Sequence, residues 1–527
     1  MSSWAGASRR AAAGAGATGA GVALGVGELI SGLVPKVGSP VVAVADVVIR
    51  RADAGVAVVA NEVLGSLNKP VVLIGVIGMS LLLGAWVGML GRSKNWVPCV
   101  AFAAFGGFGW WALASAPGGS PLWSGGAIAV AALGGWAASE RLVALDAGTV
   151  RAGEDGGDEL QRDRRRFLLG LIGVGSGAAL SGGVGRWLRA SRSVEAERAV
   201  VRQALGEREG VAPATAGVSA GAELEGDAIE GLTPYLTPTA DFYRIDTSAE
   251  IPVIEPDGWT LTVGGRVAEP LTMTLDDLLA EDLVDRVVTL TCVSNPIGGD
   301  YAGTATWTGI PLSRLLERAG ADPSADQIIG RSWTGWTAGF PRSVIDDGRS
   351  ALVAVGMNGD ALPARHGFPA RLVVAGLYGY VSATKWLTEI ELAGWDDFDA
   401  YWIERGWAKE GPIKMASRID TPTAGSRLQA GRVVVAGVAW APLGGVGAVE
   451  VWFDSVGEWL PAQLGRATSG ETWVQWWIDV DLTPGPQVAR VRALDTRGSV
   501  QSEVQRAPFP DGAEGYHRIR FDVVANR

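Results

Sequence analysis

Long apolar segments recur through the N-terminal part of the chain. They cover Ala11 to Val34, about 69 to 90, about 97 to 115, about 121 to 143, and Phe167 to about Leu188. Each segment is close to the roughly 20 helical residues that are needed to cross a bilayer. The pattern therefore predicts a membrane domain of about five transmembrane helices in residues 1–188.

Charged residues modify this picture at two places. Residues 39–64 are apolar but carry Arg50, Arg51 and Asp53 in mid-run, which predicts an interfacial or amphipathic helix rather than a span. Glu28 falls inside the first span, and a carboxylate within a membrane segment is a candidate functional group. Because Glu28 lies near one end of the span, we favour a side chain that extends to the membrane surface.

The positive charges between the spans predict the orientation of the chain in the membrane. Arg9 and Arg10, the loop with Arg92 and Lys94, and the QRDRRR segment before Phe167 all fall on one side, whereas the loop APGGSPLWSGG carries no charge. With the positive side in the cytoplasm, five spans place everything after the last span on the extracytoplasmic face. We therefore expect a multi-pass protein of the cell membrane, with the lipid bilayer as a partner.

The entry to the last span has a second interpretation. Arg164, Arg165 and Arg166 precede Phe167 and a mildly apolar stretch rich in Gly and Ser. This arrangement resembles the twin-arginine export signal, which serves proteins that are translocated already folded, usually around a cofactor. The alternative is a simple positively charged anchor, and the arginines alone do not separate the two.

The rest of the chain has the composition of globular protein. Residues 189–230 mix a charged helical stretch with Ala, Gly, Ser and Pro, which predicts a linker. Residues 231–420 combine short β-branched strands with short helices such as Leu312 to Arg318, which predicts an α+β domain. Residues 421–527 contain short alternating strands separated by turns, which predicts an immunoglobulin-like β-sandwich. The strands predicted for the α+β domain are Trp259–Val263, Arg286–Thr291, Ala351–Val355 and Arg371–Val374.

Tryptophans in the β-sandwich are candidates for a partner surface. The strand TWVQWWIDV contains Trp473, Trp476 and Trp477, so alternation must turn at least one of them away from the core. An outward tryptophan beside Trp452 or Trp459 would form an apolar patch of the kind that partners cover. The alternative is that these tryptophans pack on the preceding domain of the same chain.

Composition excludes several classes of partner and cofactor. The formal net charge of -11 argues against a nucleic-acid partner, since no dense basic face is visible. Two cysteines and two histidines provide neither the thiolates of an iron–sulfur cluster nor the Cys/His cluster of a zinc site. Neither histidine lies in an apolar segment, so we expect no membrane haem with two histidine ligands.

Cys292 is the main candidate for metal chemistry. It follows the β-branched run Val287–Thr291 and precedes the turn-rich stretch from Asn295 to Gly299, so we expect it where a strand ends in a loop. A single thiolate there can provide the one protein bond to a metal whose other ligands come from a cofactor. The alternative is a small buried hydrophobic side chain.

The globular half resembles the sulfite oxidase family of molybdenum-cofactor oxidoreductases, in its bacterial membrane-anchored branch. The motifs are TLTCVSN, GTATWTGIPL, MNGDALPARHGFPARLVVAGLYGYVSATKW and GPIKMASRID, and the resemblance covers about residues 232–527. It implies a sulfite-oxidase-like fold for residues 231–420 and a molybdenum–molybdopterin (Mo-MPT) cofactor. It also implies that residues 421–527 form a dimerisation domain, so a homodimer is expected.

The resemblance also assigns roles to residues. Cys292 corresponds to the cysteine that binds molybdenum, and it is the expected catalytic and metal-binding residue. An arginine fork suits the cofactor's terminal phosphate. The positions expected to bind the cofactor are Tyr243, Arg244, Cys292, Ser332, His366, Arg371, Ser382, Thr384 and Lys385.

Departures from the family pattern bear on the substrate. Cys292 is followed by Val293 and Ser294, whereas sulfite-oxidising members have a basic pair there. We expect Trp333, Trp336 and Tyr378 to line a pocket that suits a neutral or weakly polar small molecule.

The sequence thus predicts a membrane-anchored molybdenum oxidoreductase that transfers an oxygen atom or electrons at an extracytoplasmic centre. Electrons would pass to or from an external or membrane carrier, because no haem domain is present and no haem, iron–sulfur cluster or zinc is expected. The alternatives are a sulfite dehydrogenase, a methionine sulfoxide or other S-oxide reductase, and a non-catalytic membrane scaffold that keeps the fold.

Overall fold

The computed structural model of the protein describes residues 3–52, 68–116, 119–152, 157–190, 194–206 and 229–525. The chain forms two compact units, and each is described by itself. The helical unit comprises Met1–Ser193 with Thr247–Ile251, and the globular unit comprises Val194–Asp246 with Pro252–Arg527.

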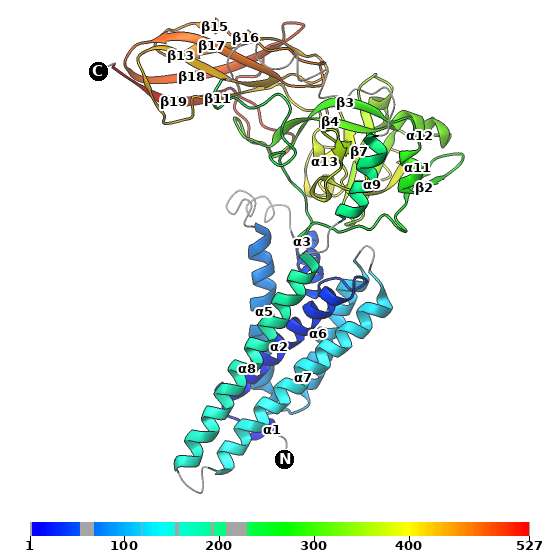
Figure 1. Cartoon of the computed structure of the whole chain (residues 1–527), viewed down its shortest axis with the longest axis vertical. Coiled ribbons are helices and arrows are strands. Elements are labelled where there is room, and N and C mark those ends of the chain that lie inside the picture. The colour runs from blue at the N-terminus through cyan, green and yellow to red at the C-terminus, as the bar shows by residue number, and fades with distance from the viewer. Residues whose placement is uncertain are drawn as a thin grey trace. The chain divides into compact units, whose positions relative to one another are not determined.

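The helical unit is a bundle in which α2 packs against α5, α7 and α8 (Figure 1). Five segments of its helices are long and apolar enough to cross a membrane, namely Arg9–Leu33, Lys69–Gly91, Val97–Ala114, Pro121–Asp146 and Arg165–Arg189. They confirm the five helices that the apolar pattern predicts. The helices are α1 (Ser3–Gly6), α2 (Arg9–Leu33), α3 (Pro40–Arg51), α5 (Asn68–Gly91), α6 (Val97–Ala114), α7 (Pro121–Ala152) and α8 (Gly157–Ala190).

Glycines on α2 allow its backbone to approach two neighbouring helices. A Cβ atom added at Gly16 would overlap the carbonyl oxygen of Gly84 on α5, and one added at Gly25 would overlap that of Ala178 on α8. Small residues at such crossings are typical of helices that associate in a bilayer, where close backbone packing replaces the hydrophobic driving force.

Glu28 does not extend to a surface, so that prediction was wrong. Its side chain is buried, accepts hydrogen bonds from the Ser39 hydroxyl and, at 3.3 Å, from the Val41 N–H, and forms a 3.0 Å ion pair with Arg189. The partners explain the difference, since α3 begins at Ser39 and α8 brings a cation to the same place. The predicted helix of residues 39–64 is seen as α3, and positions 53–67 lie outside the described residues.

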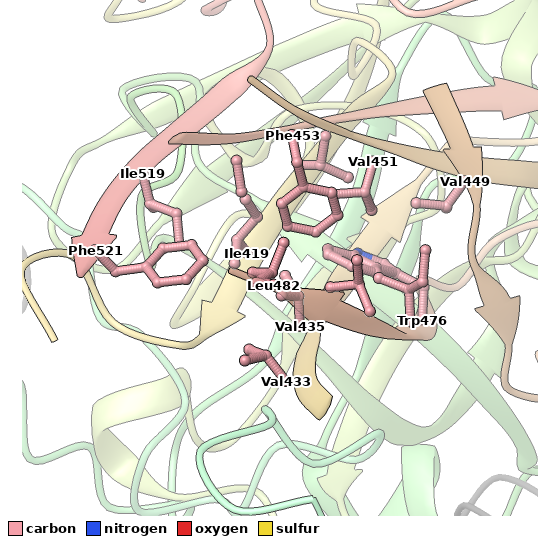
Figure 2. Close-up of a cluster of buried hydrophobic side chains, with 14 of the residues drawn as sticks. Ile419, Val433, Val435, Val449, Val451, Phe453, Trp476, Leu482, Ile519 and Phe521 are labelled. Carbon is pink, nitrogen blue, oxygen red and sulfur yellow. The ribbon is translucent and has the colours of Figure 1, made fainter. Parts of the chain in front are cut away.

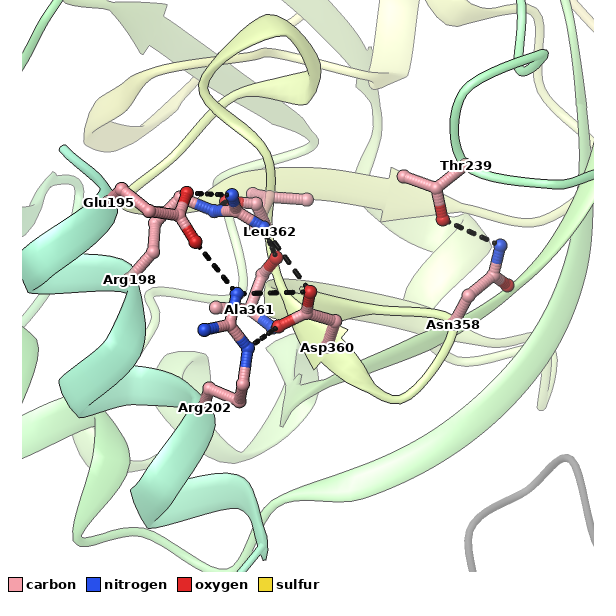
Figure 3. A network of polar contacts seen from close by, with 8 residues as sticks. All are labelled: Glu195, Arg198, Arg202, Thr239, Asn358, Asp360, Ala361 and Leu362. Atoms are coloured by element: carbon pink, nitrogen blue, oxygen red, sulfur yellow. Dashed lines mark hydrogen bonds and ion pairs between the residues drawn. The ribbon is translucent and has the colours of Figure 1, made fainter. Parts of the chain in front are cut away.

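Residues 195–206, which fall in the predicted linker, form helix α9 (Glu195–Gly206) in the globular unit. Arg198 donates hydrogen bonds to the carbonyl oxygens of Ala361 at 2.9 Å and Leu362 at 3.2 Å, and Arg202 pairs with Asp360 at 2.7 Å (Figure 3). The helix therefore packs against residues 360–362 of the globular unit and does not act as a free linker. Positions 191–193 and 207–228 of the predicted linker lie outside the described residues.

Two sheets form the first part of the globular unit. One has the order β2-β1-β10-β5-β6, and the other has the order β3-β4-β7-β8 with β9 paired to β7. A core of Val288, Leu290, Trp307, Leu352 and Val373 fixes β3, β4, β7 and β9 against each other. The predicted strands and the predicted helix 312–318 are found at these places, which confirms an α+β arrangement.

The elements of this part are as follows. The strands are β1 (Leu261–Gly265), β2 (Leu271–Met273), β3 (Val284–Thr291), β4 (Ala302–Pro311), β5 (Gln327–Ser332), β6 (Thr337–Pro341), β7 (Ala351–Met357), β8 (Asp360–Ala361), β9 (Arg371–Val374) and β10 (Leu387–Ala393). The helices are α11 (Leu275–Leu279), α12 (Leu312–Arg318) and α13 (Gly379–Ser382), with short 3-10 turns η2 (Arg342–Ile345), η3 (Ala364–His366) and η4 (Ile403–Arg405).

The C-terminal part is a two-sheet β-structure around one core. The first sheet has the order β11-β13-β17-β16 and the second has the order β12-β19-β18-β14-β15. Alternate residues of β14 and β17 point inward, and Val451, Phe453 and Trp476 meet Ile519 and Phe521 between the sheets (Figure 2). The strands are β11 (Ala416–Thr421), β12 (Arg427–Gln429), β13 (Gly431–Trp440), β14 (Val446–Phe453), β15 (Trp459–Pro461), β16 (Gln463–Leu464), β17 (Val474–Leu482), β18 (Gly485–Asp495) and β19 (His517–Val524).

The tryptophans of the strand TWVQWWIDV take three different places. Trp476 is in the sandwich core, and Trp473 is buried with its indole N–H donating to the Tyr235 carbonyl at 2.8 Å. Trp477 points outward from the first sheet, whereas Trp452 and Trp459 of the second sheet meet edge to face, with ring centroids 5.8 Å apart. The predicted joint patch is therefore not formed, and Trp473 follows the alternative of packing within the chain.

The buried Phe453 side chain gives a test of this core. Phe453→Ala should destabilise the C-terminal β-structure by about 3–5 kcal/mol, because it leaves a cavity among fully buried neighbours. We expect a lower unfolding temperature in thermal unfolding of the full chain in detergent. Val524→Ala, at a position that is 36% exposed, is the control and should change stability by less than about 0.5 kcal/mol. Equal effects of the two changes would contradict this core.

Candidate functional site

Cys292 lies directly after β3, where the strand ends. Its N–H donates to the Tyr301 carbonyl at 2.9 Å, and its Sγ lies 2.9 Å from the Ser294 hydroxyl. Surrounding protein atoms shield the sulfur, and this burial raises the pKa of the thiol although Ser294 and Lys385 act in the opposite direction. The structure thus holds a protonated thiol that a bound metal ion would convert to a thiolate.

Arg371 is a buried cation without a carboxylate partner. Its Nη1 donates to the His366 carbonyl at 3.1 Å, its Nε donates to the Leu372 carbonyl at 3.3 Å, and its guanidinium stacks on the Trp307 ring at 4.7 Å. No Asp or Glu among the described residues pairs with it. Burial lowers its pKa to about 10, which shows that the protein alone does not fully compensate this charge.

Asp246 is shared by two further cations. Its Oδ2 lies 2.7 Å from Arg244 Nε and 3.0 Å from Lys385 Nζ, and the carboxylate is almost fully buried. Burial lowers the pKa of Lys385 to about 8, and Asp246 counteracts part of that shift while Arg371 adds to it. Asp246 thus pairs with Arg244 and Lys385, whereas Arg371 has no carboxylate partner among the described residues, so the three cations outnumber the one carboxylate.

His366 is buried beside this cluster and is neutral. Desolvation, together with Arg371 and Lys385, lowers its pKa to about 3. Its Nε2 lies 3.2 Å from the Thr239 carbonyl, which can only accept, so the proton is on Nε2. Phe242 packs edge-on against the ring at 5.6 Å and fixes its plane.

Two tyrosines connect Cys292 to these groups. Burial raises the pKa of Tyr243, a thiolate at Cys292 would raise it further, and Arg371 acts in the opposite direction. Burial raises the pKa of Tyr378 to about 12, and a thiolate at Cys292 would act in the same direction. Both hydroxyls therefore stay protonated and neutral.

The predicted hydroxyl donors have partners in the protein. The Ser382 hydroxyl donates to the Tyr378 carbonyl at 3.1 Å, and the Thr384 hydroxyl lies 3.5 Å from the Gly330 carbonyl. Ser332 is at the end of β5, where its hydroxyl lies 3.0 Å from that of Thr334. These residues surround the Lys385 loop, and their hydroxyl groups point to protein atoms rather than to one common point.

The two predicted pocket tryptophans lie in the turn between β5 and β6. The Trp333 N–H donates to the Trp386 carbonyl at 2.7 Å, and the Trp336 carbonyl accepts from the Ser332 N–H at 2.9 Å. No described contact links either of them to Cys292. Of the three predicted aromatic residues, only Tyr378 is placed near the thiol.

The turn that carries His366 is held from two sides. On one side, Arg198 of helix α9 donates hydrogen bonds to the carbonyl oxygens of Ala361 and Leu362, directly before this turn (Figure 3). On the other side, Asn358 donates to the Thr237 carbonyl at 3.0 Å and to the Thr239 hydroxyl at 3.1 Å. Residues 237–239 and 358–366 are therefore held together by hydrogen bonds. These bonds position the Thr239 carbonyl, which orients the His366 imidazole.

The donor set suits a ligand with a soft metal and an anionic tail. A thiol is available for one metal bond, and the unpaired guanidinium of Arg371 can bind a phosphate in a bidentate manner. Within the described ranges, no group of three or more His, Cys, Asp or Glu side chains is arranged to hold a metal by itself. The other metal ligands would have to come from the bound molecule.

Comparison with known proteins decides the family. The oxidoreductase molybdopterin binding domain matches residues 248–402. Human mitochondrial sulfite oxidase is 25% identical over 317 residues, which is 51% of this chain and 58% of that protein. The uncharacterized oxidoreductase YuiH of Bacillus subtilis is 30% identical over 155 residues, which is 29% of this chain and 74% of that protein. The chain belongs to the sulfite oxidase family of molybdopterin oxidoreductases.

Membership of the sulfite oxidase family makes the chain an oxidoreductase and implies a molybdenum–molybdopterin cofactor. The chain spans 58% of the length of the human sulfite oxidase that it matches. Among solved structures, the sulfane dehydrogenase SoxCD of Paracoccus pantotrophus aligns with a TM-score of 0.49 and 20% identity, covering 59% of this chain and 90% of that one.

Sequence reasoning missed three contributors to the charge and packing of the site. Asp246 holds both Arg244 and Lys385, Trp307 supports Arg371, and Phe242 orients His366. Asp246 could have been found, because it lies two residues after Arg244 in the segment DFYRID. No sequence signal distinguishes Trp307 from an ordinary core tryptophan.

Arg371 gives a test of cofactor anchoring. Arg371→Ala should reduce molybdenum content, because it removes charge-assisted hydrogen bonds worth about 1.5–3 kcal/mol each. The stability of the metal-free protein should not fall, since the change removes an uncompensated buried charge. Elemental analysis and thermal unfolding measure the two effects.

The control for this test is Arg331→Ala, on β5, where the cation already pairs with Glu391. It should leave the molybdenum content unchanged. Unchanged molybdenum in the Arg371 variant would show that the anionic part of the cofactor binds elsewhere.

Proposed function

We propose that the protein is a membrane-anchored molybdenum oxidoreductase that transfers an oxygen atom or electrons at an extracytoplasmic centre. The observation that carries the proposal is Cys292, a single thiol beside a buried cluster that has more cations than carboxylates. Family membership supports the redox assignment, and the five apolar helices support the anchor.

Each residue of the site has a role in this proposal. Cys292 would bind the metal, Arg371 and Lys385 would hold the phosphate, and neutral His366 would offer Nδ1 as an acceptor. Tyr243 and Tyr378 would cover the thiol with neutral hydroxyls. Ser332, Ser382 and Thr384 would shape the loop around Lys385. The bound cofactor supplies the two-electron chemistry, which side chains of this type do not provide.

The orientation and partners follow from the positions of charge and from the family. The positively charged loops support a catalytic domain outside the cytoplasm. Electrons would pass to an external or membrane carrier, and no haem, iron–sulfur cluster or zinc is assigned to this chain. The dimer through residues 421–527 rests on the resemblance to a dimerisation domain, and its immunoglobulin-like type stays a prediction.

Replacement of the thiol tests the metal site. Cys292→Ser should abolish activity and reduce molybdenum to background, because a hydroxyl is a hard, poor substitute for a thiolate. The control is Cys99→Ser, which changes the other cysteine, on α6. Wild-type protein without molybdenum, after expression in a host that makes the cofactor, would disprove the proposed function and leave the scaffold alternative.

Replacement of Arg164 and Arg165 by Lys tests the route of export. We expect the globular unit to remain in the cytoplasm, because the twin-arginine signal is read by a receptor and lysine preserves only its charge. Protease accessibility in intact spheroplasts measures the location. The same change at Arg9 and Arg10 is the control and should leave the domain outside. A domain that stays accessible in the Arg164 and Arg165 variant would favour the simple positively charged anchor.

A further inference from the structure

Two groups of Ser294 contact the side chain of Cys292. The Ser294 hydroxyl lies 2.9 Å from the Cys292 Sγ, and the Ser294 backbone N–H also hydrogen-bonds to that side chain. A thiolate that binds a metal has no proton of its own and can only accept hydrogen bonds. In the metal-bound state the hydroxyl must therefore donate to the sulfur.

The loop that carries Ser294 is closed on itself by hydrogen bonds. The Asn295 N–H donates to the Cys292 carbonyl at 3.1 Å, and the Asn295 side-chain oxygen accepts from the Tyr301 N–H at 2.9 Å. The Cys292 N–H donates in turn to the Tyr301 carbonyl. These bonds join the beginning of the loop to its end, so the position of Ser294 is fixed without a ligand.

The C-terminal β-structure holds the same loop at its far end. Arg418, on β11, donates from Nη1 to the Gly299 carbonyl at 2.9 Å, and its Nε pairs with Asp420. The His517 ring, at the start of β19, packs on Gly298, where an added Cβ atom would lie 2.3 Å from the imidazole. Gly298 has a φ of 75°, so both its conformation and this contact favour glycine. Side chains of two strands thus fix the loop from outside.

Hydrogen bonds to a ligand sulfur change the properties of the metal that the sulfur binds. They stabilise negative charge on the sulfur and reduce its donation to the metal, which favours the more reduced state of the centre. The potentials of copper–thiolate and iron–sulfur sites are tuned in this way. Because Cys292 is the one protein ligand proposed here, donors to its sulfur are a direct way for the chain to act on the metal.

We propose that Ser294 is a positioning residue that acts through Cys292, because its hydroxyl donates to the metal-bound sulfur and raises the reduction potential of the centre. Arg418 is a second positioning residue, which keeps the loop and this hydroxyl in place. The inference rests on the proposed function, since it assigns residues that tune electron transfer at the same site.

Potentiometric titration of the molybdenum-loaded full chain in detergent, followed by electron paramagnetic resonance, tests the role of Ser294. Ser294→Ala should lower the potential by on the order of 59 mV, the shift for a tenfold change in a one-electron equilibrium constant, because one hydrogen bond to a charged group is lost. Its molybdenum content should equal that of wild type.

A matched pair of variants separates the hydrogen bond from the shape of the side chain. Ser294→Thr keeps the hydroxyl and should have a potential close to that of wild type. Ser294→Val has the same β-branched shape without the hydroxyl, and it should shift the potential as Ser294→Ala does. This pair also serves if thermal unfolding shows that Ser294→Ala does not fold.

The same titration tests positioning by Arg418. Arg418→Lys keeps a cation beside Asp420 but loses the guanidinium fork that reaches the loop, so it should also lower the potential. Combined with Ser294→Ala it should give no further shift, because both changes act on one hydrogen bond. The control is Ser455→Ala, which removes a hydroxyl that donates to the Gln487 side chain at 2.6 Å, and it should leave the potential unchanged.

Three results would overturn the role of Ser294. They are an unchanged potential in the Ala and Val variants, equal shifts in the Thr and Val variants, and loss of molybdenum from Ser294→Ala, which would indicate a role in binding instead. Additive shifts in the double variant would overturn the role of Arg418. A failure of the proposed function appears separately, as the absence of molybdenum from wild type.

Discussion

The buried positive charge around Arg371 is the constraint on which the site depends. Asp246 pairs with Arg244 and Lys385, whereas Arg371 has only carbonyl groups and the face of Trp307 for support. Such an arrangement is unfavourable in a protein alone, because a buried ion needs a partner of opposite charge. A bound anion supplies the missing opposite charge and so makes the arrangement favourable. The relief of the unpaired buried charge therefore contributes to the affinity for an anionic ligand.

The titratable groups around the cations are neutral, so the cations remain available to an anionic ligand. His366 stays uncharged because burial and the neighbouring cations oppose its protonation, and Tyr243 and Tyr378 stay protonated because burial disfavours the phenolate. None of them competes with an anionic ligand for Arg371 or Lys385. The bracing of residues 237–239 by Asn358 fixes this arrangement before any ligand is bound.

Local patterns and non-local contacts differ in how far the sequence reveals them. The five apolar helices, the strand before Cys292 and helix α12 were predictable, because periodicity and turn residues are properties of neighbouring positions. Glu28 was not, since its partner Arg189 is far away in the chain and no local pattern joins them. The site residues came from motif resemblance, whereas their support by Asp246 and Trp307 depends on packing that a single sequence does not encode locally.

Strand β3 explains why the C-terminal β-structure matters to a site that lies mainly outside it. One face of β3 is fixed by Val288 and Leu290 in the core of the first part. On the other face, the Thr289 hydroxyl accepts from the Trp473 N–H at 2.8 Å, and the Thr289 N–H donates to the Glu471 carbonyl at 3.1 Å. Because Cys292 comes three residues later in the chain, the position of the thiol is set from both sides of this strand. The two parts of the globular unit therefore act as one support for the metal-binding residue.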